Sequence, residues 1–91
     1  MIFDTEQIAF NKIRGKVVEL IEHEKFCSVT LQVGHANFRL VNLSCKKIYF
    51  EKLLKSIELE DKVVCQFYVS SIKKNERWYN HLSLLSCEKQ T

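Results

Sequence analysis

The expected fold rests on the stretch Ser71-Ile72-Lys73-Lys74-Asn75-Glu76-Arg77-Trp78-Tyr79. Apolar and polar residues alternate on both sides of its short basic turn, over 63–72 and over 78–87. An alternation with a period of two is typical of strands that bury one face, and a polar turn between two such runs predicts a hairpin. The C-terminal third is therefore predicted to be a β-hairpin with two large aromatic residues directly after its turn.

Three further strands are predicted upstream, over 13–22, 26–33 and 36–43. Gly15 fits a bulge or a barrel bend in the first strand, where a side chain would obstruct a sharp coil. The second strand alternates cleanly and is expected to turn one set of residues toward the core: Cys27, Val29, Leu31 and Val33. In the third strand, Phe38 and Leu40 are expected to point inward, whereas Asn37 and Arg39 point outward.

The hydrophobic period changes over 46–57, where a helix is predicted. Its apolar stripe comprises Ile48, Phe50, Leu53, Leu54 and Ile57. Three strands, one helix and two strands match the order of an all-β, five-stranded Greek-key OB-fold barrel, in which the helix lies between strands three and four. A split α+β sheet with one helix is the alternative. We expect one domain over 1–91, with a leader over 1–11 and the barrel over 12–88.

Composition narrows the class of protein. Fourteen Lys and Arg residues against 11 Asp and Glu give a net charge of +3, which permits a polyanionic partner without requiring one. No run of about 18 apolar residues is present, so no membrane span is predicted. The acidic N-terminus also lacks the basic start and long apolar core of a signal peptide. These observations predict a cytoplasmic protein.

The pattern of chemically reactive residues predicts neither a metal site nor catalysis. The four cysteines, at 27, 45, 65 and 87, form no Cys-x-x-Cys pair, and the histidines at 23, 35 and 81 stand alone. Buried thiols in a reducing compartment are expected, and a disulfide would require two cysteines to meet in the fold of an exported protein. No phosphate-binding glycine loop or nucleophile motif is present, so we expect no enzyme and no cofactor.

Three segments resemble small bacterial OB-fold proteins of the single-stranded-DNA-binding and primosomal accessory kind. They are the charged turn and Val-rich strand over 59–69, the segment 75–80 with Leu82, and the first strand over 14–19. The resemblance covers roughly 12–88. It differs at the turn, where Lys-Lys-Asn-Glu stands in place of the Asn-Gly that such families often carry. It implies a non-enzymatic barrel that binds single-stranded nucleic acid, preferably DNA, with low sequence specificity.

In an OB barrel, strands two and three and the loops joining strands one–two and four–five line the binding surface. The expected contacts combine cations for phosphates with rings for stacking: Arg14, Lys16, Phe26, Thr30, Arg39, Tyr68, Lys73, Lys74, Arg77, Trp78 and Tyr79. Lys73, Lys74 and Arg77 are placed on the four–five loop. Phe26 lies on the polar face of strand two and is the expected stacking platform. Trp78 and Tyr79 are adjacent, so only one of them is expected to point outward.

A second function class fits the same chain. An OB barrel can present a sheet edge and an apolar patch to another protein, as an interaction adaptor within a larger complex, and it can pair into a homodimer. The partners would be single-stranded DNA or RNA in the first case, and replication or mobile-element proteins in the second. A continuous cationic groove on the face of strands two and three would favour nucleic acid, whereas a flat apolar patch with dispersed charge would favour the adaptor.

Overall fold

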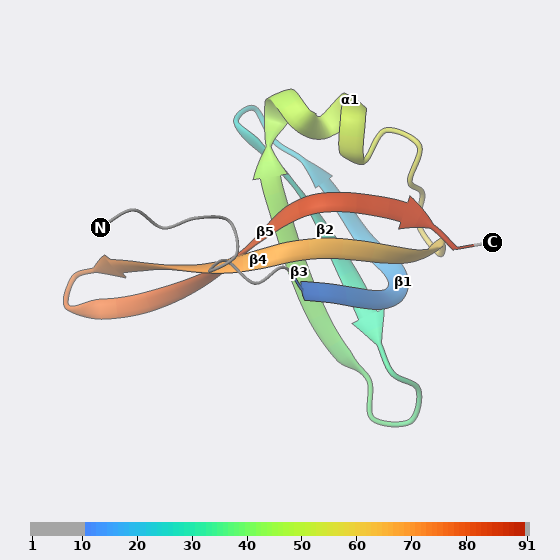
Figure 1. Ribbon diagram of the computed structural model, residues 1–91, viewed down its shortest axis with the longest axis horizontal. Helices are drawn as coiled ribbons and strands as arrows, with labels where there is room; N and C mark the ends of the chain where they lie inside the picture. Colours follow the sequence, from blue (N-terminus) through green and yellow to red (C-terminus); the bar gives the residue numbers. More distant parts are fainter. Residues whose placement is uncertain (1–10, 91) are drawn as a thin grey trace.

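Five strands close into a barrel in the computed structural model, which describes residues 11–90. The strands are β1 (Asn11–Glu22), β2 (Phe26–Val33), β3 (Arg39–Lys46), β4 (Lys62–Lys74) and β5 (Arg77–Lys89). Their order around the barrel is β1-β2-β3-β5-β4, and a short helical segment lies between β3 and β4 (Figure 1). The predicted all-β OB-fold architecture is therefore confirmed. The predicted leader lies outside the described residues apart from Asn11, with which β1 begins.

β1 is long enough to pair with two neighbours, which is how the barrel bends. Its first half is antiparallel to β4, from Asn11↔Phe67 to Lys16↔Lys62, and its second half is antiparallel to β2. Gly15 lies where the strand passes from one partner to the other. A Cβ atom on Gly15 would lie 2.8 Å from the carbonyl oxygen of Gln32, a contact too close for any other residue type without a shift of the backbone. The predicted role of Gly15 in a barrel bend is confirmed.

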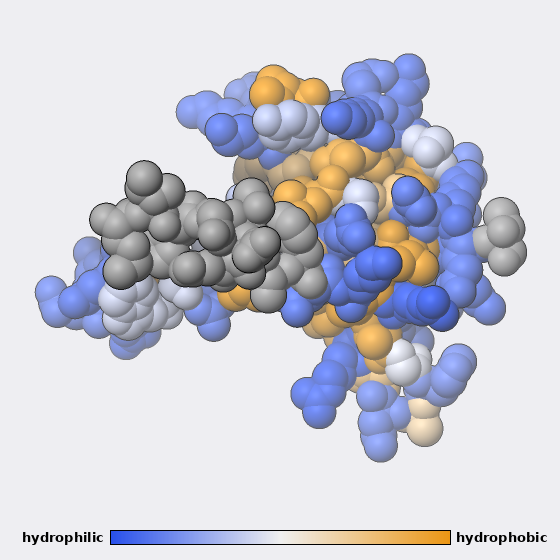
Figure 2. Space-filling model, viewed as in Figure 1, coloured by the Kyte–Doolittle hydropathy of each residue, from blue (hydrophilic) through white to orange (hydrophobic). Residues whose placement is uncertain are grey.

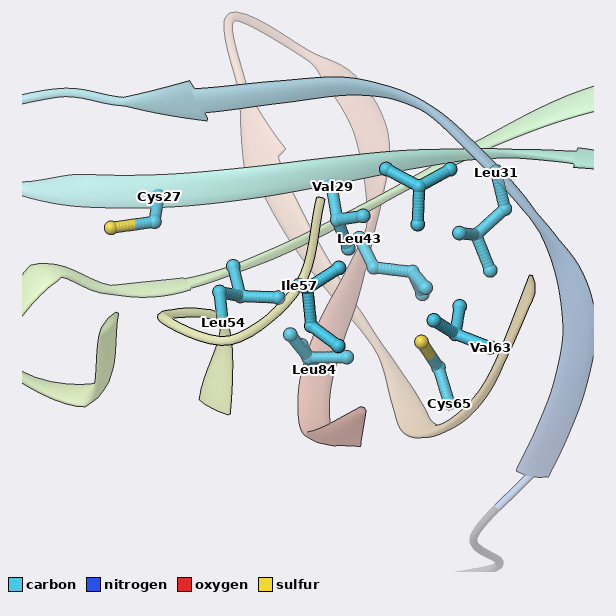
Figure 3. Packing of buried hydrophobic residues seen from close by; sticks show 10 residues of the cluster. Cys27, Val29, Leu31, Leu43, Leu54, Ile57, Val63, Cys65 and Leu84 are labelled. Atoms are coloured by element: carbon cyan, nitrogen blue, oxygen red, sulfur yellow. The ribbon is translucent and has the colours of Figure 1, made fainter. Parts of the chain in front are cut away.

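The core is formed by alternate residues of the strands and is closed at one end by residues that follow β3. Cys27, Val29 and Leu31 of β2 are fully buried, as predicted. Leu54 and Ile57 pack against Leu84 of β5 and cover the end of the barrel beneath the helical segment (Figure 3). The buried apolar cluster comprises Val17, Cys27, Val29, Leu31, Leu43, Leu54, Ile57, Val63, Cys65 and Leu84.

The inward face of β3 differs from the prediction. Phe38 and Leu40 are exposed, whereas Val41, Leu43 and Cys45 face the core. The strand begins only at Arg39, because Gly34 at φ 92° starts a longer turn that carries Phe38 beyond the barrel. The β2–β3 hairpin extends past the barrel wall at the bottom of Figure 1, so its tip has no core to cover.

The helix is shorter than predicted. A 3₁₀ turn over Lys47–Tyr49 leads into α1, which spans Phe50–Leu53. The tighter 3₁₀ turn breaks the 3.6-residue period, so the predicted apolar stripe is not continuous. Ile48 is 75% exposed, and only Leu54 and Ile57 of the predicted stripe are fully enclosed.

The β4–β5 hairpin projects from the barrel as a two-stranded arm, seen in orange at the left of Figure 1. Pairing continues to Lys74↔Arg77, which leaves a loop of Asn75 and Glu76 alone. Both loop residues have positive φ, 52° and 65°, which is the backbone of a type I′ turn. Lys73, Lys74 and Arg77 therefore stand on the ends of the strands and not in a loop, contrary to the prediction.

Candidate nucleic-acid interface

A groove of about 760 Å³ lies between the helical segment, β3 and β5. Its lining comprises Phe26, Ser44, Cys45, Lys46, Tyr49, Lys52, Leu53, Tyr68, His81, Ser83, Leu84 and Leu85. On the face seen in Figure 2, apolar surface gathers between the helical segment at the top and the strands below it. Five separate stretches of the chain thus supply one concave surface, which the barrel closure brings together.

Three aromatic side chains from three elements line this groove. Phe26 starts β2, Tyr49 ends the 3₁₀ turn, and Tyr68 lies in β4. Phe26 and Tyr49 are each almost half exposed, which leaves ring surface free for a ligand. The His23 ring lies 4.5 Å from the Phe26 ring, centroid to centroid, and supports it from the β1–β2 turn. The arrangement offers flat apolar faces on which planar groups can stack.

Polar groups line the groove at the seam between β3 and β5. The two strands run parallel there, at the pair Ser44↔Ser83. The Ser44 Oγ and the His81 Nε2 are 3.1 Å apart and form a hydrogen bond. Both groups line the groove together with Ser83, so one lining combines hydrogen-bonding atoms with aromatic rings.

Two lysines on the groove wall have free ammonium groups. Within residues 11–90, Lys46 and Lys52 form no ion pair. Two other lysines of the same segment already have carboxylate partners. Lys47 pairs with Glu22 and lies 5.5 Å from the centroid of the Phe50 ring. The Lys55 ammonium is 2.9 Å from Glu51, and this hydrogen bond and charge raise the pKa of Lys55. Of the four lysines over 46–55, the two that line the groove thus keep their charge available for an anion.

The arm presents a different set of side chains on each face. The register pairs Tyr79 with Ile72 and Arg77 with Lys74, and alternation places all four on the face that also carries Tyr68 and His81. The other face carries Trp78, whose ring centroid lies 5.9 Å from the Lys73 ammonium. Trp78 is 68% exposed and Tyr79 is 52% exposed. The prediction that only one points outward is wrong, because both faces of a two-stranded arm lie in solvent.

The exposed face of β2 and β3 is polar and not cationic. Thr30 accepts a hydrogen bond from Asn42 at 2.8 Å and donates one to Glu19 at 3.3 Å. Arg39 pairs with Val33, so its side chain is exposed but stands on the opposite side of the strand from Thr30 and Asn42. The prediction that Arg39 lies on the outward face of the third strand is wrong, because β3 starts later than expected and Arg39 has the parity of the core-facing residues. This face is neither a continuous cationic groove nor a flat apolar patch.

Arg14 and Lys16 lie in a second hollow of about 400 Å³, which shares no lining residue with the groove. Lys62 and His35 are also part of its lining, and Lys16 forms an ion pair with Glu60 at 3.3 Å. Of the residues predicted from the sequence, the structure therefore brings together Phe26 and Tyr68 in the groove, and continues that face along the arm through Lys74, Arg77 and Tyr79.

Ten of the twelve lining residues are absent from the sequence-based site, and four of them carry a cation, a ring or an imidazole: Lys46, Tyr49, Lys52 and His81. The helical period of 46–57 is typical of a helix whose lysines form an ordinary solvated face, and the isolated position of His81 in the sequence gives no signal for a site. A signal for the first three exists in the sequence, because they recur every three residues, as on one side of a helical turn, and Lys46 lies opposite Phe26. His81 could not be found in this way, since its place depends on the closure of β5 onto β3.

Two further features are absent from the described residues. Over 11–90 there is no group of three or more His, Cys, Asp or Glu side chains that could hold a metal ion. The same part of the chain has no helix that is long and apolar enough to cross a bilayer.

Solved structures with this barrel include proteins that bind single-stranded DNA. The mitochondrial single-stranded DNA-binding protein Rim1 of S. cerevisiae superposes with a TM-score of 0.70, at 12% identity over 91% of this chain and 96% of that one. The dimeric N-terminal domain of PriB from Thermoanaerobacter tencongensis gives 0.63, at 18% identity over 90% and 96%. A small single-stranded DNA-binding protein from Streptomyces coelicolor gives 0.59, at 10% identity over 92% and 95%. These likenesses show the fold.

No protein-family model matches the chain, and no curated protein matches it in sequence.

Proposed function

We propose that this protein binds single-stranded DNA with low sequence specificity and performs no catalytic step. The observation that carries the proposal is the groove between the helical segment, β3 and β5, whose lining combines the rings of Phe26, Tyr49 and Tyr68 with hydrogen-bonding side chains. The similarity in fold to proteins that bind single-stranded DNA supports the same function. Rings that are half exposed and come from separate elements suit a ligand made of flat, stackable units.

The side chains divide by role. The rings of Phe26, Tyr49 and Tyr68 stack on bases, which requires no particular sequence because every base has a flat face. Lys46 and Lys52 neutralise phosphates beside the groove, and Lys74 and Arg77 do so along the arm. Ser44, His81 and Ser83 hydrogen bond to base edges or to phosphate oxygens. The preference for DNA over RNA is part of this proposal and is supported by the similarity in fold to proteins that bind single-stranded DNA.

Fluorescence anisotropy with a labelled oligo-dT of about 20–30 nucleotides tests the proposal, with the RNA oligomer and a DNA duplex of equal length as competitors. We expect binding at low salt that weakens steeply as salt rises, and competition by the duplex only at much higher concentration. Tight binding that does not change with salt would contradict the electrostatic part of the mechanism. Absence of binding at low salt would overturn the whole proposal.

A second candidate function is a protein-interaction adaptor that uses the β2–β3 hairpin. Phe38 and Leu40 are more than half exposed at its tip, where they have no core to cover. We also propose a homodimer, because the solved PriB domain is dimeric. Sedimentation of the wild-type protein and of Leu40→Ser distinguishes the two: a dimer that dissociates in the variant would assign the hairpin to self-association. A monomer in both cases would overturn the homodimer.

A further inference from the structure

All four cysteines of the chain lie directly opposite another cysteine in the barrel. Cys27 pairs with Cys45 between β2 and β3, and Cys65 pairs with Cys87 between β4 and β5. The Cα atoms of directly opposed residues in antiparallel strands are about 4.5–5.5 Å apart, which falls within the range that a disulfide spans. The four thiols are reduced in this structure. Cysteines that are far apart in the sequence are thus paired by strand register.

Cys65 and Cys87 are already in contact through their sulfur atoms. The Sγ–Sγ distance is 3.2 Å, with the Cys65 thiol donating a hydrogen bond to Cys87. Cys65 is fully buried, whereas Cys87 is partly open to solvent. A disulfide bond would require the two sulfur atoms to approach by about 1.2 Å, which rotation about the two Cα–Cβ bonds can supply.

We propose that Cys65 and Cys87 form an oxidative modification site, in which a peroxide links β4 to β5 reversibly. With a peroxide, the Cys87 thiolate attacks one oxygen and forms a sulfenic acid, and hydroxide leaves. The Cys65 sulfur then attacks the Cys87 sulfur. The Cys65 proton and the sulfenic hydroxyl leave as water, so two thiols lose two electrons and the peroxide gains them. A small dithiol reverses the step by thiol–disulfide exchange.

The pKa values of the two thiols differ in the direction that this order of reaction, first Cys87 and then Cys65, requires. The hydrogen bond from Cys65 lowers the pKa of Cys87 and thus favours its thiolate, which is the form that attacks an oxidant. The same hydrogen bond and burial raise the pKa of Cys65, which therefore stays protonated until its partner has reacted. The more exposed thiol is thus the more nucleophilic one, and the enclosed thiol resolves the intermediate.

The second pair lacks this asymmetry. Burial raises the pKa of Cys27, and burial together with the Cys27 charge raises that of Cys45. Neither sulfur favours its thiolate, so this pair should react more slowly. Figure 3 shows Cys27 and Cys65 at opposite ends of the buried cluster, so the two pairs act separately. Cys27 and Cys45 therefore serve as an internal control for Cys65 and Cys87.

The cross-link would close a chain segment that contains the whole arm. Residues 66–86 form the remainder of the β4–β5 hairpin, including its turn. A cross-link restricts the unfolded chain more than the folded one, so it should stabilise the protein against urea. Neither Cys65 nor Cys87 lines the groove, so binding of DNA and oxidation of this pair are separate properties with separate tests.

The test counts thiols in the reduced full-length protein after treatment with stoichiometric hydrogen peroxide, by maleimide labelling under denaturing conditions and mass spectrometry. We expect the loss of two thiols, with the Cys65 and Cys87 peptides joined and the Cys27 and Cys45 peptides still labelled. Dithiothreitol should restore all four thiols. The oxidised protein should unfold at a higher urea concentration than the reduced protein.

Two variants make the result decisive. Cys87→Ser removes the proposed nucleophile at a partly exposed position, and it should keep its three remaining thiols and show no shift in the urea midpoint. Cys45→Ser is the matched control and should still form the Cys65–Cys87 link. The proposal is overturned if wild-type protein keeps four thiols, if peroxide joins Cys27 to Cys45 instead, or if only links between two chains form.

Discussion

The hydroxyl of Ser44 and the Nε2 atom of His81 lie 3.1 Å apart across the seam that closes the barrel. β3 and β5 are paired there at one position, Ser44↔Ser83, so the side-chain hydrogen bond extends the contact beyond the backbone. The residues of this seam line the groove together with Phe26 and Tyr68. The pairing of β3 with β5 therefore closes the barrel and also brings the residues of the candidate site together.

Removal of a groove ring should weaken binding without unfolding the protein. In Tyr68→Ala, the loss of one stacking contact of about 1–3 kcal/mol should lower the affinity for oligo-dT by roughly 5- to 150-fold. Leu59→Ala is the matched control, because Leu59 is a large exposed residue outside the groove. Anisotropy titrations at one salt concentration measure both. Equal affinities of the two variants would remove Tyr68 from the site.

The two free lysines of the groove should contribute to the salt dependence. Lys46→Gln and Lys52→Gln should each make the slope of log K against log salt shallower by about 0.7, the value for one phosphate contact on a single strand. Lys55→Gln should leave the slope unchanged, because the Lys55 ammonium already pairs with Glu51. Titrations at four or more salt concentrations give the slopes. A change of the same size in Lys55→Gln would mean that net charge, and not position, governs binding.

Two apolar residues of the helical segment should differ sharply in their effect on stability. Leu54→Ala leaves a cavity at a fully buried position and should lower the free energy of unfolding by about 2–5 kcal/mol. Ile48→Ala removes an exposed side chain and should change it by less than about 0.5 kcal/mol. Urea denaturation at pH 7 under reducing conditions measures both. Similar losses would contradict the placement of Ile48 in solvent.

The reduced protein should lose stability in alkaline solution. Burial raises the pKa of Cys27 and Cys45 above the ordinary thiol value of 9.0, and the Cys87 hydrogen bond with burial raises that of Cys65. Above pH 9.0 the unfolded chain releases these protons while the folded chain retains them, so unfolding becomes easier as pH rises. The lowered pKa of Cys87 has the opposite effect on stability. Three thiols with raised pKa values stand against this one, so we expect a net loss of stability.

Urea midpoints at several pH values between 8 and 10 test this expectation. The decline should be shallower in the double variant Cys27→Ala, Cys45→Ala, which removes two of the three groups. An equal decline in the wild-type protein and the double variant would assign the effect to groups other than these thiols.

The strand order could be predicted from the sequence because alternation is a local property. Each run between 13 and 87 carries its own period of two, and a run of helical period separates the third strand from the fourth. The prediction of which β3 residues face the core was wrong, because the alternation of apolar and polar residues does not determine the length of the turn before the strand. Gly34 begins a longer turn than expected, so β3 starts three residues later than predicted. Because three is an odd number, this shift moves Phe38 and Leu40 from the core to the surface.

The groove could be predicted only in part, because it is made by contacts between distant segments. Phe26 and Tyr68 were found from aromatic residues on a polar strand face, which is local information. His81 belongs to the site only because β5 lies beside β3, and Tyr49 only because a 3₁₀ turn follows β3. Arg14 and Lys16 have the right chemistry but occupy a different hollow, which their charge alone could not reveal.

The position of Trp78 on the arm determines whether DNA binding changes the tryptophan fluorescence. The chain contains a single tryptophan, and strand alternation places Trp78 on the arm face that is turned away from Tyr68 and His81. A strand of DNA confined to the groove side would leave this fluorophore in its original environment, so binding would be silent in tryptophan emission. Quenching would show that the nucleic acid passes around the arm and contacts both of its faces.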